Sequence, residues 1–255
     1  MMTALARSKN MVSIRILQSI GVHYAQDWIT RFGFDADKHL PYLPMALGSG
    51  SVTPLQMAGA YTVFANGGYR VDPVLIESIT DSKGKLLSER RPAQLDESTR
   101  TLPARNAFVM SSLLNQVVRN GTGASAYRAL KRGDLYGKTG TTNDSMDAWF
   151  GGWQPSIVAV VWIGYDPPRK LGDRETGGGL SLPVWTEFMS YALRGVPVQE
   201  LSAANAPAGV VNVGSQWVYE EYSRGAGVNS LGLEDRGPQL PTEEERKSIL
   251  DLFKR

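Results

Sequence analysis

The 255-residue sequence contains no cysteine, which excludes disulfide frameworks, thiolate metal sites and cysteine nucleophiles. Its only histidines are His23 and His39, so a histidine-rich metal centre is not expected, and we predict neither a metal nor a cofactor. An excess of one charge is also lacking, because 27 Lys and Arg against 25 Asp and Glu leave a net charge of +2. This balance argues against a nucleic-acid partner.

Long hydrophobic runs are missing as well. The longest strongly apolar run covers residues 157 to 163, far below the roughly 20 residues that a membrane-spanning helix requires. The first ten residues lack the apolar segment and the small-residue cleavage site of a secretory signal. We therefore expect a chain without a visible signal or anchor, which would remain in the cytoplasm where it is made.

The residues that are present predict a folded α+β chain, since 42% hydrophobic content is enough for a real core. Apolar periodicity predicts helices that end at glycines, and Thr53 followed by Pro54 is typical of a helix start. A polar turn between two short apolar runs predicts a hairpin. The predicted helices cover residues 11 to 20, 53 to 68, 104 to 119 and 183 to 195, and the hairpin covers 70 to 89.

Three strands are predicted in quick succession, and their short connections indicate antiparallel pairing. They cover residues 135 to 141, 147 to 153 and 156 to 165. Four tryptophans within these strands and the following helix are expected in the core, namely Trp149, Trp153, Trp162 and Trp185. We predict one domain over 1 to 196 and a poorly structured tail over 197 to 255 that closes with a short helix near Thr242.

The run Lys138-Thr139-Gly140 carries the clearest chemical signal. A phosphate-binding loop would need a glycine at position 132, where the chain has Arg132, and would have to open a helix rather than a strand. The run instead predicts a strand that lines a cleft, where the lysine ammonium and the threonine hydroxyl face an anionic ligand. Gly140 would let that ligand approach the backbone closely.

Lys-Thr-Gly, together with Ser-x-x-Lys and Ser-Asp-Asn, forms a known signature of penicillin-interacting serine enzymes. Ser8-Lys9-Asn10 stands upstream of Lys138-Thr139-Gly140 in the correct order. Longer strings strengthen the likeness, and over about residues 1 to 196 the chain resembles the transpeptidase domain of class A, bifunctional penicillin-binding proteins. The strings are residues 47 to 58, 137 to 144, 147 to 150 and 177 to 179. The resemblance implies an incomplete penicillin-binding or serine β-lactamase-like fold, an antiparallel sheet packed with helices that lacks its N-terminal part.

The resemblance also implies roles for individual residues. Ser8 would relay protons near the leaving group, and Asn10 would hydrogen-bond the donor peptide. Lys138 and Thr139 would hold the substrate carboxylate, and the backbone N–H of Thr141 would join the oxyanion hole. The implied partners are the D-Ala-D-Ala stem peptide of peptidoglycan and β-lactams, and the implied parent protein works in the periplasm, anchored in the inner membrane.

The attacking serine of that family is not found where the resemblance requires it. Its Ser-x-x-Lys motif should precede Ser8 at the start of a buried helix, yet the one such string, from Ser82 to Lys85, follows Ser8 and falls in a polar turn. We therefore expect the C-terminal part of a D,D-transpeptidase domain, inactive alone and separated from the glycosyltransferase part of its parent. A non-catalytic binding or regulatory fragment and a β-lactamase or carboxypeptidase relative remain alternatives, although residues 49 to 54 favour the transpeptidase.

Overall fold

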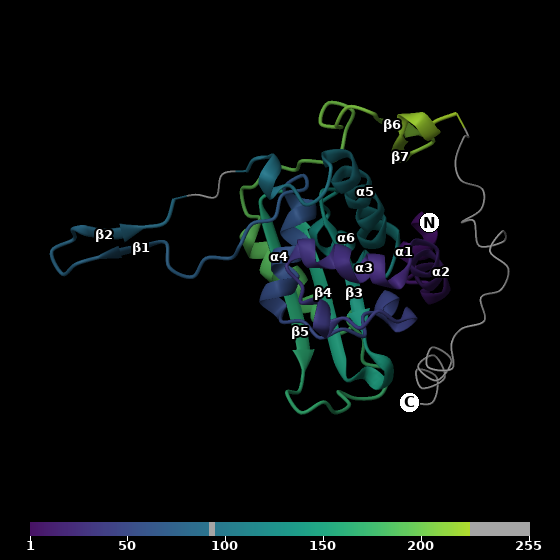
Figure 1. The fold of residues 1–255 in the computed structure, drawn as a ribbon, viewed down its shortest axis with the longest axis horizontal. Helices are drawn as coiled ribbons and strands as arrows, with labels where there is room; N and C mark the ends of the chain where they lie inside the picture. Colours follow the sequence, from purple (N-terminus) through teal and green to yellow (C-terminus); the bar gives the residue numbers. More distant parts are fainter. Residues whose placement is uncertain (92–94, 225–255) are drawn as a thin grey trace.

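The computed structural model describes residues 1–91 and 95–224, which form a body of helices around a sheet and one projecting arm (Figure 1). The helices are α1 (Met2–Ala6), α2 (Asn10–Ile20), α3 (Val22–Ile29), α4 (Pro54–Ala65), α5 (Ala104–Asn120), α6 (Ala124–Leu130) and α7 (Ser181–Ala192). The strands are β1 (Ser78–Thr80), β2 (Leu86–Glu89), β3 (Tyr136–Thr141), β4 (Asp147–Gln154), β5 (Ile157–Gly164), β6 (Val210–Val213) and β7 (Gln216–Tyr219). No helix in the described ranges is long and apolar enough to cross a membrane.

The central sheet has the strand order β3-β4-β5, and both pairings are antiparallel. Side chains alternate between its two faces, so neighbours on β4 contact different helices. Phe150 packs edge-on against Trp185 of α7, whereas the space above Gly151 is filled by the ring of Tyr61 from α4. Helices α4 and α7 therefore cover opposite faces, and the predicted α+β architecture is confirmed.

The core lies on both sides of this sheet. One buried cluster is centred on Phe150 and Trp185, and the other stacks Tyr136 on Trp153 with ring centroids 5.2 Å apart. Trp149 and Trp162 are only partly buried and face each other across β4 and β5. The prediction of core tryptophans is thus confirmed for Trp153 and Trp185, while the other two sit closer to solvent.

Most of the predicted elements are found. The capping box between Thr53 and Gln56 starts α4, and Gly21 ends α2 as expected. Helix α7 begins two residues before Pro183, because Pro is tolerated anywhere in a first turn whose N–H groups lack helical partners. The short helices α1, α3 and α6 were not predicted, and the apolar run 74 to 76 precedes strand β1 rather than forming it.

The expectation of a poorly structured segment after residue 196 is wrong for residues 210 to 219. Strands β6 and β7 pair there in an antiparallel hairpin, and Trp217 packs edge-on against Phe108 of α5 at 5.1 Å between ring centroids. This contact gives the hairpin an apolar anchor on the body. The helix expected near Thr242 lies outside the described residues, and the domain boundary at 196 stays a prediction.

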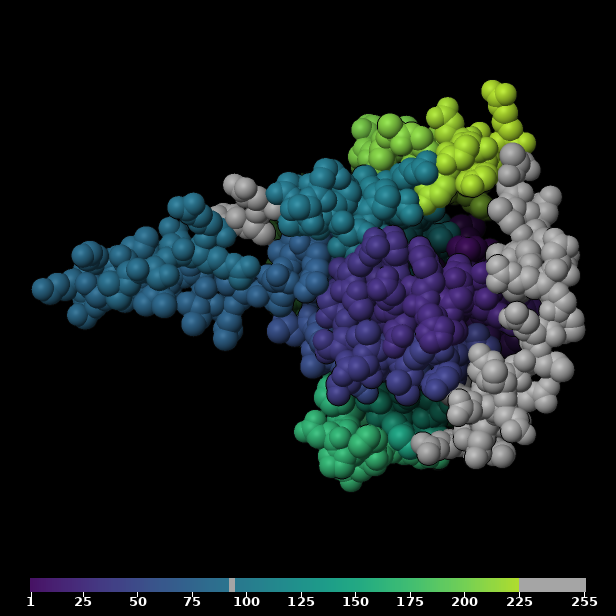
Figure 2. Space-filling model, in the orientation of Figure 1, coloured from purple at the N-terminus to yellow at the C-terminus, as the bar shows by residue number. Residues whose placement is uncertain are grey.

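The β1–β2 hairpin forms an arm that projects from the body (Figures 1 and 2). Its turn is held by the Asp81 carboxylate, which accepts hydrogen bonds from the backbone N–H groups of Lys83 and Lys85 at 2.8 and 2.9 Å. All residues of both strands are exposed. The arm therefore adds no buried core, and the candidate site lies elsewhere.

Candidate active site

Lys138 and Ser8 meet at the outer edge of β3, although 130 positions separate them in the chain. The Lys138 ammonium donates a hydrogen bond to Ser8 Oγ at 2.8 Å and another to the backbone carbonyl of Thr139 at 2.9 Å. Burial lowers the pKa of Lys138 to about 8. A fraction of the side chain is then a neutral amine near neutral pH, and the same 2.8 Å contact can carry a proton between the Lys138 nitrogen and the Ser8 hydroxyl.

The turn between α1 and α2 holds Ser8 in place. Ser8 has a φ of 52°, in the left-handed region that few non-glycine residues adopt, and its N–H donates to the Leu5 carbonyl at 3.1 Å. The end of α1 packs closely on the loop after α5, because a Cβ at Gly121 would lie 2.2 Å from the Ala6 carbonyl oxygen. A larger residue at Gly121 would therefore push the Ser8 turn away from β3.

Strand alternation places Thr139 and Thr141 on the face of β3 opposite Lys138. The hydroxyl of Thr139 lies 2.7 Å from the hydroxyl of Thr122, and that of Thr141 accepts a hydrogen bond from the Gly177 N–H at 3.1 Å. Gly177 crosses the sheet so closely that a Cβ there would lie 2.4 Å from the Gly140 carbonyl oxygen. The glycine-rich loop after β5 thus closes one side of the site.

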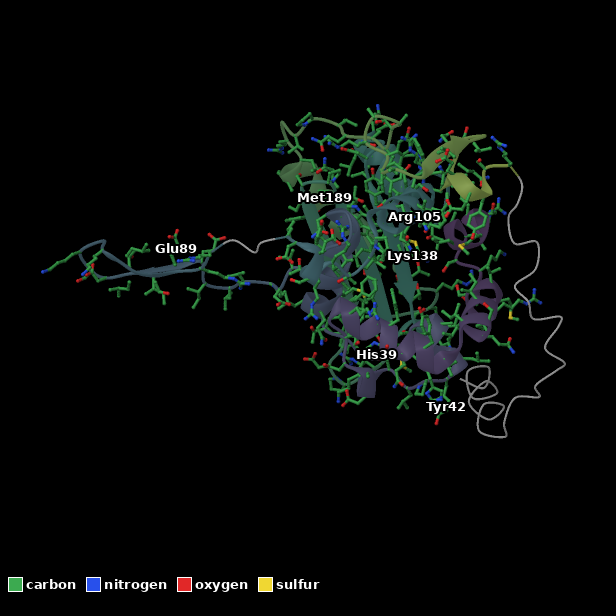
Figure 3. The ribbon with its side chains drawn as sticks, turned by 45° about the horizontal axis from the view of Figure 1, so that its top comes forward. His39, Tyr42, Glu89, Arg105, Lys138 and Met189 are labelled. Atoms are coloured by element: carbon green, nitrogen blue, oxygen red, sulfur yellow. The ribbon has the colours of Figure 1, made fainter. Side chains whose placement is uncertain are left out.

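Other residues singled out in the sequence lie apart from this contact. Asn10 is the exposed first residue of α2, and within the described chain it makes no hydrogen bond to Ser8 or Lys138. Ser82 and Lys85 are exposed at the turn of the arm. Figure 3 shows Glu89 on this arm, well separated from Lys138 in the body. The Ser-x-x-Lys string therefore does not reach the Lys138 site.

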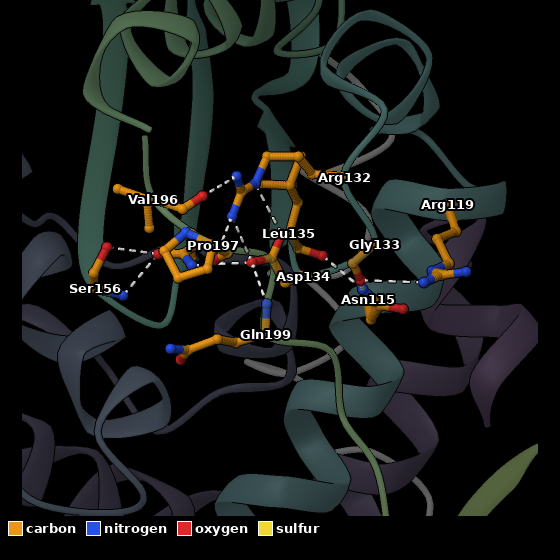
Figure 4. A network of polar contacts seen from close by, with 11 residues as sticks. Asn115, Arg119, Arg132, Gly133, Asp134, Leu135, Ser156, Val196, Pro197 and Gln199 are labelled. Atoms are coloured by element: carbon orange, nitrogen blue, oxygen red, sulfur yellow. Dashed lines mark hydrogen bonds and ion pairs between the residues drawn. The ribbon is translucent and has the colours of Figure 1, made fainter. Parts of the chain in front are cut away.

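A buried polar network fixes the chain where it enters β3 (Figure 4). Arg132 donates to both carboxylate oxygens of Asp134, at 3.0 and 2.8 Å, and Gln154 and the backbone N–H of Gln199 donate to the same group at 2.9 and 3.0 Å. Burial raises the pKa of Asp134, but these hydrogen bonds outweigh it and hold the pKa below its ordinary value. The network thereby anchors β3 four residues ahead of Lys138.

Sequence reasoning missed two parts of this site. Thr122 lies in the stretch between the predicted helix over residues 104 to 119 and the predicted strand from 135, and nothing local indicates that its hydroxyl reaches Thr139. Asp134 and Gln154 were also overlooked, although a charged residue directly before an apolar strand and a glutamine at a strand end are signals for a buried polar contact.

Comparisons with known proteins identify the family to which the chain belongs. The family model "Penicillin binding protein transpeptidase domain" matches residues 1–189. Penicillin-binding protein 1A of Neisseria flavescens is 44% identical over 96% of this chain, and that of Neisseria lactamica is 46% identical over 95%. In each case the chain spans 30% of the relative's length.

Solved structures agree on the fold. Penicillin-binding protein 1A of Haemophilus influenzae matches with a TM-score of 0.75 and 32% identity, covering 82% of this chain and 36% of that one. PonA1 of Mycobacterium tuberculosis, solved in complex with penicillin V, matches with a TM-score of 0.63 and 23% identity, over 79% and 58% of the two chains, and supports the fold only.

The antiparallel sheet with helices on both faces matches the penicillin-binding transpeptidase fold. The chain belongs to the penicillin-binding protein transpeptidase family and is similar to class A members of the 1A type. The predicted resemblance is confirmed. This family acts in the synthesis of the bacterial cell wall.

Proposed function

We propose that this chain forms the substrate-binding wall of a peptidoglycan D,D-transpeptidase, which binds D-Ala-D-Ala stem peptides and β-lactams and cross-links the cell wall. The observation that carries this proposal is the 2.8 Å contact between Lys138 and Ser8. It joins the two sequence motifs whose combination is typical of penicillin-interacting serine enzymes. We also propose that the complete protein works in the periplasm from an inner-membrane anchor.

The wall suits acyl transfer from a peptide that ends in a carboxylate. The peptide would lie along the outer edge of β3, where the long Lys138 side chain brings its ammonium to the Thr139 carbonyl at 2.9 Å. A carboxylate bound there would meet both this ammonium and the Thr139 hydroxyl. The N–H of Thr141 would stabilise the oxyanion that forms when the peptide bond is attacked. Ser8 would pass a proton to the departing D-alanine amine and recover one from Lys138, so that the leaving group departs neutral.

The attacking serine is proposed to lie outside these 255 residues. Ser82 is exposed on the arm, and Lys85 has its backbone N–H tied into the same turn, so this pair is not built as a buried nucleophile and base. Ser8 is assigned to proton relay rather than attack. The isolated chain would therefore bind the peptide without cleaving it.

Peptide binding directly tests the proposed substrate-binding wall, which is the outer edge of β3 with Lys138 and Thr139. Titration with an N-acetylated D-Ala-D-Ala peptide should show binding that Lys138→Ala weakens by roughly 1.5 to 3 kcal/mol, the scale of a charge-assisted hydrogen bond. Lys170→Ala is a matched control, because the Lys170 side chain is 61% exposed and lies 3.9 Å from Asp144. Equal affinities for the wild type and Lys138→Ala would contradict the proposed wall.

Intact-mass spectrometry with penicillin tests the missing nucleophile. We expect no stoichiometric mass increase, because losing one oxyanion donor alone typically costs about 10²- to 10³-fold in rate and the attacking group is absent as well. Ser8→Ala and Ser82→Ala should behave like the wild type. An adduct that maps to Ser8 or Ser82 would show that the chain carries its own nucleophile.

A further inference from the structure

The hydroxyl pair of Thr122 and Thr139 has a consequence for ligand selection. The two Oγ1 atoms lie 2.7 Å apart, and either can be the donor in the absence of a ligand. Each hydroxyl holds one proton and two lone pairs, so only one of them can give its proton to the other. The direction of this hydrogen bond therefore decides whether Thr139 can still donate to a ligand.

The hydroxyl of Thr141 also takes part in a hydrogen bond, and here the direction of the bond is fixed by the partner. The backbone N–H of Gly177 can only donate, so the Thr141 hydroxyl accepts from it at 3.1 Å and keeps its own proton free. If Thr122 donates to Thr139, then Thr139 also keeps its proton free. Two hydroxyl groups on the same face of β3 would then offer protons rather than lone pairs.

Thr122 is placed firmly enough for such a role. Its N–H donates to the Ala6 carbonyl at 3.1 Å, next to the turn that holds Ser8. Its carbonyl lies 3.4 Å from where a Cβ of Gly178 would be, beside the glycine-rich loop that crosses the sheet. Thr122 is nevertheless exposed and Thr139 is partly buried, so a ligand can reach the pair.

We propose that Thr122 is a specificity-determining residue, which donates its proton to Thr139 and so turns the Thr139 hydroxyl into a donor for an acceptor-only group of the ligand. A carboxylate only accepts hydrogen bonds, whereas a primary carboxamide both donates and accepts. Thr122 thereby favours peptides with a free C-terminal carboxylate over their amides. The inference rests on the proposed function, because it assigns a ligand carboxylate to the Thr139 hydroxyl.

Two ligands and three variants test the inference. Affinities are measured for N-acetyl-D-Ala-D-Ala and for its C-terminal carboxamide, and the ratio of the two is compared between variants. Thr122→Val keeps the side-chain shape but removes the donor, so it should lower the carboxylate preference roughly tenfold, mainly through weaker carboxylate binding. Thr122→Ser should restore the preference. Thr186→Val is the matched control, because among the described residues that hydroxyl donates only to the Leu182 carbonyl within α7.

Equal weakening of both ligands in Thr122→Val would overturn the inference, since it would indicate a change of shape rather than of hydrogen-bond direction. If the wild type binds neither ligand, the proposed function fails, and the χ1 angle of Thr139 then decides the inference through methyl NMR couplings. A single χ1 in the wild type and Thr122→Ser that becomes averaged in Thr122→Val would support the positioning of Thr139 by Thr122. An unchanged χ1 in Thr122→Val would overturn it.

Discussion

One charged group precedes strand β3 and another lies within it, and their surroundings differ. Asp134 is fully buried and accepts hydrogen bonds from Arg132, Gln154 and the backbone of Gln199 (Figure 4). Lys138 is partly buried and bonded to a serine hydroxyl and a carbonyl, and within the described chain it has no carboxylate partner. The first charge is neutralised, and the second is left unneutralised.

Under the proposed function, this difference separates a residue that stabilises the strand from one that binds the ligand. The paired carboxylate of Asp134 stays ionised, because its hydrogen-bond partners lower its pKa below the ordinary value in spite of burial. The ammonium of Lys138 has no carboxylate partner among the described residues, so burial destabilises its charged form and lowers its pKa to about 8. An amine that is charged but ready to exchange a proton is what binding a carboxylate and relaying a proton require.

The largest effect on stability is expected from breaking the ion pair between Arg132 and Asp134. Asp134→Ala leaves the Arg132 guanidinium, whose side chain is only 12% exposed, without its carboxylate. Removing one partner of a buried ion pair typically costs about 3 to 5 kcal/mol. Urea denaturation should show a loss of this size in the free energy of unfolding, and a loss no greater than that of an ordinary surface substitution would contradict the anchoring role of the network.

The pH dependence of the wild type checks the same pair. Because the pKa of Asp134 is lower in the folded chain than in the unfolded chain, its contribution to stability is present above the unfolded pKa. This contribution is lost as the pH falls below that value. Asp134→Asn should therefore be less sensitive than the wild type to acid, and identical acid profiles of the two would argue against the pairing.

Replacing the unpaired Lys138 should change the free energy of unfolding in the opposite direction. Lys138→Met removes a desolvated charge but keeps an apolar stem of similar length, so we expect the free energy of unfolding to rise by roughly 1 to 2 kcal/mol at neutral pH, after allowance for partial solvation. Peptide binding should be lost in the same variant. Stability gained at the expense of binding would mark Lys138 as a functional rather than a structural residue.

The pH dependence of stability tests whether desolvation of the Lys138 ammonium causes this gain. Between pH about 8 and 10.5 the unfolded chain holds the lysine proton more tightly than the folded chain does, so the stability of the wild type rises with pH in this window. The advantage of Lys138→Met should therefore shrink across the same window. Lys170→Met, at an exposed position, should show no such trend, and a constant advantage of Lys138→Met would rule out desolvation as its cause.

The fold was largely predictable because its signals are local. Strands β3 to β5 follow from strand-like runs separated by short turns, and helix α4 follows from the Thr53 cap, and both signals depend on neighbours within a few residues. The hairpin β6–β7 was missed although its signal was present. Gly214 and Ser215 both have positive φ, which is typical of the two-residue turn of a hairpin, but the flanking strands are only four residues long each.

The site was predictable only in part, because its contacts join distant segments. Spacing alone does not bring Ser8 to Lys138, and only the family resemblance assigned both residues to one site. The hydrogen bond between Thr122 and Thr139 depends on how closely the end of α5 packs on α1. Gly121 permits this close packing, but a glycine at that position does not predict it. Buried pairs such as Arg132 with Asp134 likewise require knowledge of which strand end is covered.

The smallest effect is expected from an ion pair of the same chemistry on the surface. Arg105 of α5 and Glu221 lie 2.8 Å apart, but their side chains are 43% and 46% exposed, so water and salt screen their attraction. The β6–β7 hairpin depends instead on the contact between Trp217 and Phe108. Glu221→Gln should leave the urea unfolding midpoint unchanged within error at low and at high salt. A loss comparable to that of Asp134→Ala would show that burial is not what distinguishes the two pairs, and would remove the basis for comparing Asp134 with Lys138.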